Sequence, residues 1–162
     1  MDAEGDVVVV GSYSGTIDFG GGLLTSQGNI DIFVLKLSGS DGSYLWAKRF
    51  GAGNADTAWD VEIAANNEIV VTGTIRSNVD FGAGPLGFAG DDDIFLARFT
   101  SAGAVLWAKS YGTGGNDRVN DMALDSLGSP VLVGEHPGPI DFGGGFLPHV
   151  GLEDIFIVKL SP

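Results

Sequence analysis

The feature that most constrains this chain is an internal repeat with a period of about 61 residues. Two motifs recur three times, each advancing by 62 and then 61 positions: Asp-Phe at Asp18-Phe19, Asp80-Phe81 and Asp141-Phe142, and Asp-Ile-Phe at 31–33, 93–95 and 154–156. A sequence that repeats in register folds as a series of similar stacked units. We therefore predict one repeat domain over residues 1–162, with units at about 1–55, 56–116 and 117–162.

Each unit has the pattern of short antiparallel β-strands. In the middle unit we expect strands at 58–65, 69–75, 94–100 and 105–111, joined by turns rich in Gly, Asn and Ser. No apolar pattern with the helical period persists, so helix should be minimal. The first unit opens at the equivalent of a second strand and the last ends after a third, which predicts ten strands in place of twelve.

Tandem four-stranded units with Gly-rich connections are typical of β-propeller blades. Three units, the outer two incomplete, are fewer than the roughly four blades of the smallest closed ring. The expected fold class is therefore all-β, with blades that form a half-propeller or a propeller fragment. In its core we expect Phe33, Phe95 and Phe156 to be buried equivalents.

Residues 114–134, at the boundary of the second and third units, contain a distinctive combination of motifs. An Asp-containing turn, Gly-Gly-Asn-Asp at 114–117, is followed by Asp-Met-Ala-Leu-Asp at 121–125, by Gly128 and by Val-Leu-Val-Gly at 131–134. This combination resembles the bacterial SBBP-type β-propeller repeat, and the resemblance covers essentially the whole chain. It implies a propeller scaffold that is extracellular or on the cell surface, as part of a longer exported protein.

Charge and composition exclude several classes of partner. The chain has 8 Lys and Arg against 21 Asp and Glu, a net charge of -13, which repels phosphate backbones and anionic lipids. We therefore expect no nucleic-acid partner. No apolar run approaches the roughly 20 residues of a membrane span, so membrane insertion is not expected either. The absence of cysteine excludes disulfides and thiolate metal ligands.

Carboxylates are the main candidate ligands for a metal. Asp91, Asp92 and Asp93 form the densest cluster, and Ca²⁺ is held in proteins by six to eight oxygen ligands. The favoured alternative is that the repeated aspartates accept backbone N–H bonds at blade corners, which explains why each copy needs one. Calcium is the one cofactor that the sequence leaves open.

Tryptophan provides the main candidate for ligand binding. Trp46 and Trp107 occupy equivalent positions and are expected to pack in the core, whereas Trp59 does not belong to the repeated frame. An exposed tryptophan outside the frame can stack on a sugar ring. Trp59 is therefore the predicted ligand-binding residue.

These residues are compatible with three functional hypotheses. We expect a non-catalytic structural or interaction scaffold that assembles with itself, head to tail, most simply as a dimer. The alternative is a multivalent carbohydrate-binding module with one weak site per blade, or a site for a protein partner. A hydrolase would use carboxylates such as Asp56, Asp117 and Glu153, but positions that look equivalent from unit to unit do not form one asymmetric catalytic centre.

Overall fold

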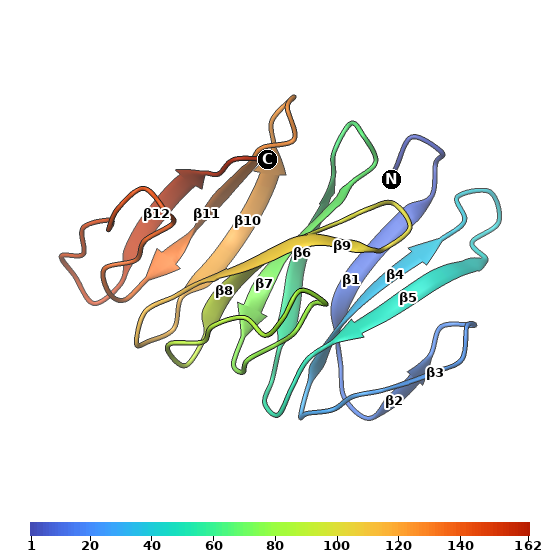
Figure 1. Ribbon diagram of the computed structural model, residues 1–162, viewed down its shortest axis with the longest axis horizontal. Helices are drawn as coiled ribbons and strands as arrows, with labels where there is room; N and C mark the ends of the chain where they lie inside the picture. The colour runs from blue at the N-terminus through green and yellow to red at the C-terminus, as the bar shows by residue number, and fades with distance from the viewer.

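The computed structural model describes all of residues 1–162 and contains β-strands but no helix, so no helix is present that could cross a membrane. Three small antiparallel sheets lie in a row in chain order, with a short hairpin at one end (Figure 1). Strand β6 of the middle sheet lies against β1 of the first sheet and β10 of the third. The three sheets form a row and do not close into a ring.

The sheets have three, four and three strands. The first has the order β1-β4-β5, the second β6-β7-β8-β9 and the third β10-β11-β12. The bounds are β1 (Val7–Tyr13), β4 (Asp31–Leu37), β5 (Tyr44–Phe50), β6 (Thr57–Ile63), β7 (Ile69–Ile75), β8 (Asp93–Phe99), β9 (Val105–Tyr111), β10 (Arg118–Leu124), β11 (Pro130–His136) and β12 (Asp154–Lys159), with the hairpin formed by β2 (Thr16–Asp18) and β3 (Leu23–Thr25).

The predicted all-β class and the ten expected strands are confirmed. Strands β7 and β9 have the predicted bounds, while β6 and β8 differ from them by one or two residues. The β2-β3 hairpin was expected only as a loop. In the other two units the same loop forms a single bridge, Asp80 with Pro85 and Asp141 with Phe146.

Each sheet pairs a glycine with a phenylalanine on the adjacent strand. The pairs are Gly11–Phe33, Gly73–Phe95 and Gly134–Phe156. A Cβ added at these glycines would lie 2.8, 2.8 and 2.6 Å from the respective phenylalanine ring, which is closer than such atoms approach. The bare backbone therefore lets each ring lie across the neighbouring strand. A loop phenylalanine, Phe19, Phe81 or Phe142, then packs on each ring with centroids 4.9 Å apart.

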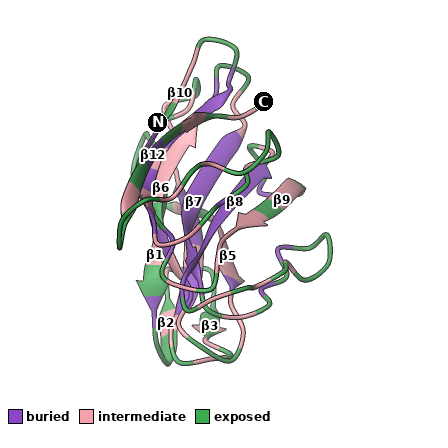
Figure 2. Cartoon of the chain, turned by 90° about the vertical axis from the view of Figure 1, so that its left-hand side faces the viewer, coloured by how far each residue is buried: buried purple, intermediate pink, exposed green.

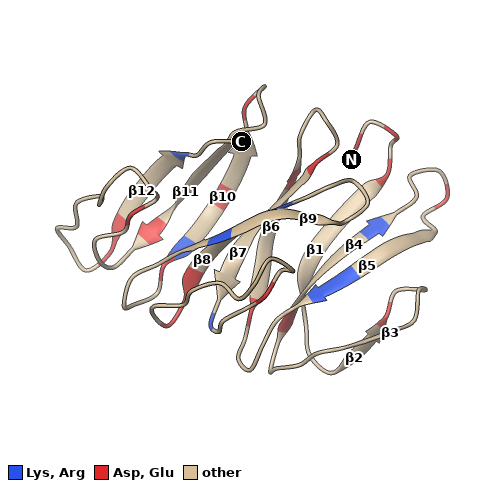
Figure 3. Ribbon diagram, in the orientation of Figure 1, with Lys and Arg blue, Asp and Glu red and all other residues tan.

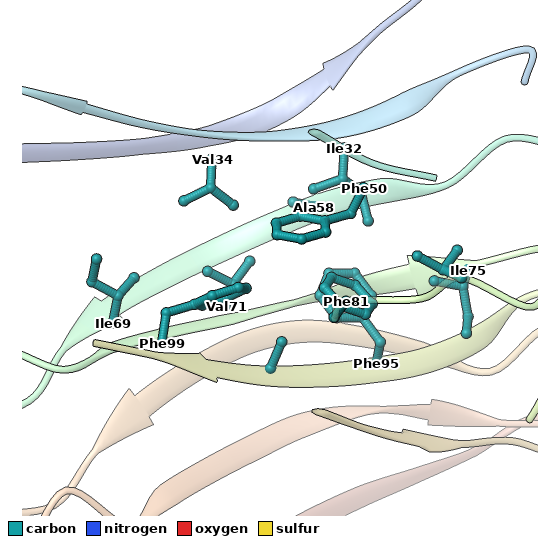
Figure 4. Close-up of a cluster of buried hydrophobic side chains, with 12 residues drawn as sticks. Ile32, Val34, Phe50, Ala58, Ile69, Val71, Ile75, Phe81, Phe95 and Phe99 are labelled. Atoms are coloured by element: carbon teal, nitrogen blue, oxygen red, sulfur yellow. The ribbon is translucent and has the colours of Figure 1, made fainter. Parts of the chain in front are cut away.

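Two hydrophobic cores lie between the three sheets. Figure 4 shows the core between the first two sheets, where Phe50, Phe81 and Phe95 gather beneath Ile32. The other core joins Ile94 and Leu96 of β8 to the third sheet. Both faces of the middle sheet are therefore covered, and every residue of β7 and β8 is buried (Figure 2).

One core prediction needs a correction. Phe95 and Phe156 are buried as expected, but Phe33 is only half-buried. The reason is its position in the row, because Phe33 points away from the middle sheet and no further sheet covers its face. The aromatic rings that pack against it are those of Phe19 and Tyr13.

The Asp-Phe-Gly motif forms the same turn in all three units. The carboxylate of Asp80 accepts hydrogen bonds from the N–H groups of Gly82 (2.6 Å) and Gly84 (3.0 Å), and Asp18 and Asp141 do the same with their own glycines. Gly82 and Gly84 have φ of 112° and 103°, a region that side chains disfavour. The motif is therefore a turn that places its phenylalanine against the strand phenylalanine of the same unit.

Candidate functional site

The repeated aspartates at the start of β4, β8 and β12 hold the loops that precede them. Asp93 accepts hydrogen bonds from the N–H groups of Ala89 (2.7 Å) and Gly90 (3.1 Å), and Asp31 accepts them from Gln27 (2.8 Å) and Gly28 (3.2 Å). Asp154 has the same pair of contacts in the third unit. Burial raises the pKa of Asp93, against the effect of these bonds. This arrangement matches the favoured interpretation, in which the repeated carboxylates accept backbone N–H bonds.

The cluster Asp91 to Asp93 does not act as one unit. Asp93 serves its loop, Asp91 is exposed, and Asp92 is buried and paired with arginine side chains. No group of three or more His, Asp or Glu side chains in the chain is placed to hold a metal ion. Calcium binding by these three residues stays the alternative hypothesis, and a structural role stays the favoured one.

The carboxylates considered for hydrolysis have structural positions. Asp56 and Asp117 are fully buried, and each accepts an N–H bond from the loop before its own strand, from Ala52 (3.0 Å) and Thr113 (2.6 Å) respectively. Glu153 is exposed in the loop before β12. None of these contacts provides the pair of facing carboxylates that glycoside hydrolysis requires.

The three tryptophans differ in their surroundings. Trp46 and Trp107 are half-buried and pack against the two hydrophobic cores. Trp59 is 61% exposed, and its Nε1–H donates a hydrogen bond to Thr74 Oγ1 at 3.3 Å. Trp59 lies at a break in the β6-β7 register, and Asn120 lies at the equivalent break between β10 and β11. Such bulges redirect side chains, and they are frequent next to functional sites.

The strongest candidate site is a cleft between the middle and third sheets, with a volume of about 620 Å³. It brings together Trp59 and Asp92, which the sequence singled out for separate reasons. Its lining comes from β6, β7 with the residue that follows it, β10, and the loops before β4, β6 and β8: Ile30, Ala55, Thr57, Trp59, Thr74, Arg76, Asp92, Arg118, Val119 and Asn120. A hollow of this size is within the range of small-molecule sites.

Two arginines and one aspartate set the electrostatics of the cleft. Arg76 makes a two-point contact with Asp92, through Nε and through Nη2 at 2.9 Å. Arg118 Nη2 lies 3.6 Å from the same carboxylate. The hydrogen bonds from Arg76 lower the pKa of Asp92 despite its burial, with a smaller contribution from the charge of Arg118. Asp92 is therefore ionised at neutral pH, and the three groups carry one net positive charge.

Sequence reasoning missed both arginines. A signal was present, because both depart from the repeat: Arg76 aligns with Ser14 and Pro137, and Arg118 aligns with Thr57. Trp59 likewise aligns with Asn120. The cleft therefore combines side chains that occur once in the chain, although the strands that hold them repeat. The equivalent carboxylates, in contrast, recur from unit to unit.

The two ends of the row form a second notable surface. Ile155 and Ile157 of β12 are 78% and 74% exposed, whereas their equivalents Ile32, Val34, Ile94 and Leu96 are all at most 1% exposed. At the other end, Val9, Phe19 and Phe33 lie on a face that no sheet covers. We call these the C-end face (Ile155, Ile157) and the N-end face (Val9, Phe19, Phe33).

No model of a known protein family and no curated protein matches this chain. Its function is therefore inferred from the cleft and the two end faces.

Proposed function

We propose that this chain is a non-catalytic structural or interaction scaffold whose three sheets are β-propeller blades, and that copies assemble head to tail through the N-end and C-end faces. The resemblance to SBBP-type repeats supports the propeller assignment and a location outside the cell or on its surface. The connectivity also fits, because each sheet is antiparallel and follows its neighbour in chain order.

The observation that carries this proposal is the contrast between equivalent side chains. Ile94 and Leu96 are fully buried because the third sheet covers them, while Ile155 and Ile157 occupy the same positions and remain exposed. Exposed apolar side chains that are contiguous on a sheet mark a surface built for contact. The chain makes this type of sheet-to-sheet contact twice within itself, so a second copy is the occupant for which the faces are shaped.

Head-to-tail contact would use both end faces at once. Each chain has one face of each kind, and two chains around a two-fold axis would bring six sheets together, within the roughly four to eight blades of closed propellers. A dimer is therefore the simplest closed assembly.

Light scattering on the intact chain at micromolar concentration tests this assembly. We expect a mass twice the 16.7 kDa of one chain. Ile157→Asp should reduce the mass to that of one chain, because it places a charge in the centre of the C-end face. A wild-type chain that is monomeric at these concentrations contradicts the assembly.

Leu127→Asp is the matched control. Leu127 is 77% exposed, but it lies in the turn between β10 and β11, outside both end faces. It changes the net charge by the same amount as Ile157→Asp, and we expect it to leave the mass unchanged. Equal loss of assembly in both variants would show that charge alone drives the effect.

A carbohydrate-binding role is the second candidate. It is supported by the exposed ring of Trp59 in a cleft whose other side chains are mainly polar. The expectation of one site per blade is replaced here by one site per chain, because the position equivalent to Trp59 holds Asn120. Multivalency would then come from assembly, with two sites in a dimer.

A further inference from the structure

We infer that the cleft beside Trp59 selects sugars that carry a carboxylate, such as the uronic acid units of acidic polysaccharides. This inference rests on the carbohydrate-binding role proposed above and adds the class of sugar. It requires a ring platform, a free cation and polar groups for hydroxyls, and each can be located in the cleft.

Trp59 provides the platform. Its ring is largely exposed, yet its orientation is held by the bulge in β6 and by the hydrogen bond to Thr74 Oγ1. A fixed aromatic face costs little conformational entropy when a ligand packs on it. Sugar rings present apolar C–H faces, which pack on such a surface.

Arg118 provides the cation. Arg76 uses two of its donors on Asp92, whereas Arg118 approaches the same carboxylate only to 3.6 Å, longer than the roughly 2.7–2.9 Å of a charge-assisted hydrogen bond. The Arg118 side chain is 55% exposed. Its planar set of donors is therefore available to a carboxylate that enters the cleft.

The charge of the cleft opposes the charge of the protein. The chain has a net charge of -13, so an anion is repelled from most of its surface. In the cleft, Arg76 and Arg118 outnumber the single carboxylate of Asp92. The excess positive charge of the cleft therefore favours an anionic sugar over a neutral one.

A second hollow, of about 530 Å³, adjoins the cleft and shares Ala55 and Arg76 with it. The residues that line this hollow include Asn29, Asn54 and Asn116, with Phe88 and Asp91. Amide groups both donate and accept hydrogen bonds, which suits sugar hydroxyls. The groove therefore accommodates an oligosaccharide, with its carboxylate on the Arg118 side and away from Asp91.

Calorimetric titration of the intact chain with tetrasaccharides tests the inference. The probes are tetragalacturonate and a tetrasaccharide that alternates glucuronic acid with N-acetylglucosamine, each compared with its methyl ester. Esterification removes the charge and keeps the sugar. We expect at least one acid to bind about ten-fold more tightly than its ester, the amount that a hydrogen bond to a charged group contributes.

Two variants locate the effect. Arg118→Gln should abolish the difference between acid and ester, and Trp59→Ala should abolish the binding of both. Lys109→Gln is the matched control, because it removes one exposed charge outside the cleft and should preserve the preference. Since Trp59 and Arg118 are exposed, unchanged melting temperatures should show that all variants fold.

The possible failures can be told apart. Equal affinity for acid and ester, with loss on Trp59→Ala, would overturn the carboxylate inference and leave the carbohydrate-binding role standing. No binding of any probe would overturn both. An equal loss in Lys109→Gln and Arg118→Gln would assign the preference to overall charge and would overturn the cleft as its source.

Discussion

The carboxylates of Asp56 and Asp117 occupy equivalent positions but differ in their partners. Asp56 Oδ1 accepts hydrogen bonds from the backbone N–H of Arg76 (2.9 Å) and the hydroxyl of Ser77 (3.0 Å). The third unit has Pro137 and Gly138 at those positions, so the N–H and the hydroxyl are both missing. Asp117 Oδ1 is consequently buried without a hydrogen-bond partner.

This difference has a consequence for stability and its pH dependence. Burial raises the pKa of Asp117, while its bonds to Thr113 and the nearby charge of His136 lower it. The carboxyl group of Asp117 therefore binds its proton more tightly in the folded state than in the unfolded chain. Between the ordinary pKa of about 3.9 and the raised value, the contribution of Asp117 to stability falls as pH rises.

Gly138→Ser is expected to stabilise the protein by about 1 kcal/mol at pH 7, because it restores the hydroxyl donor that Ser77 gives to Asp56. A Cβ at Gly138 would lie 3.4 Å from the nearest atom of Thr113, an approach that needs little adjustment. Urea unfolding at pH 7 and near pH 3 measures the effect, and the gain should shrink at the lower pH, where Asp117 is protonated in both states.

Gly138→Ala separates the effect of the hydroxyl on stability from the effect of reduced backbone freedom in the unfolded chain. It adds the same Cβ without a donor, so its gain should be smaller than that of Gly138→Ser and independent of pH. Equal effects of the two substitutions would contradict a role for the hydroxyl.

At the scale of elements, strands β8 and β12 show how one sequence motif acquires different surroundings. Both begin with Asp-Ile-Phe, and both place the phenylalanine over a glycine of the preceding strand. Every residue of β8 is buried, whereas Ile155 and Ile157 of β12 are exposed. The strands are locally equivalent, and their burial differs because only β8 has a sheet on each side.

Phe95→Ala should destabilise the protein by about 3–5 kcal/mol, as expected for a fully buried phenylalanine. Its ring packs on Gly73 and against Phe81, so its loss leaves a cavity between two sheets that the glycine cannot fill. Urea unfolding measures the change. Phe146→Ala is the control, since Phe146 is 74% exposed and its loss should cost little. Similar results for the two substitutions would mean that the strand register differs from the one described.

At the scale of the whole molecule, acidic residues lie on all three sheets and on the connecting loops (Figure 3). A net charge of -13 destabilises the compact state through self-repulsion, and any added salt relieves it. A specific calcium site would add an effect that other divalent ions do not reproduce. Asp92 pairs with arginines, Asp93 holds its loop and Asp91 is exposed, and these different surroundings favour a general effect only.

Melting curves in millimolar Ca²⁺ and Mg²⁺ at equal ionic strength, with EDTA as the reference, distinguish the two effects. We expect Ca²⁺ and Mg²⁺ to raise the melting temperature equally. A larger increase in Ca²⁺, removed by Asp92→Asn or Asp93→Asn, would establish a calcium site in the cluster and would end the purely structural interpretation.

The sequence by itself determined the repeat unit, the all-β class and the strands. These properties depend on local physics, because alternation of apolar side chains and glycine-rich turns specify strands wherever they occur. The Asp-Phe-Gly turns and the glycine–phenylalanine pairs belong to this level, and the same residues produce them in every unit. The structural role of the repeated aspartates could also be inferred, since a repeated residue serves a repeated backbone geometry.

Only the tertiary structure decided where the units differ. The half-burial of Phe33 and the exposure of Ile157 depend on whether a neighbouring sheet is present, which no local pattern records. The cleft likewise required packing of the second sheet against the third, because Trp59, Arg76 and Arg118 are far apart in sequence and break the repeat at unrelated points. Trp59 and Arg76 have partners within the second unit, Thr74 and Asp92, and the stacking of units brings Arg118 of the third unit to them.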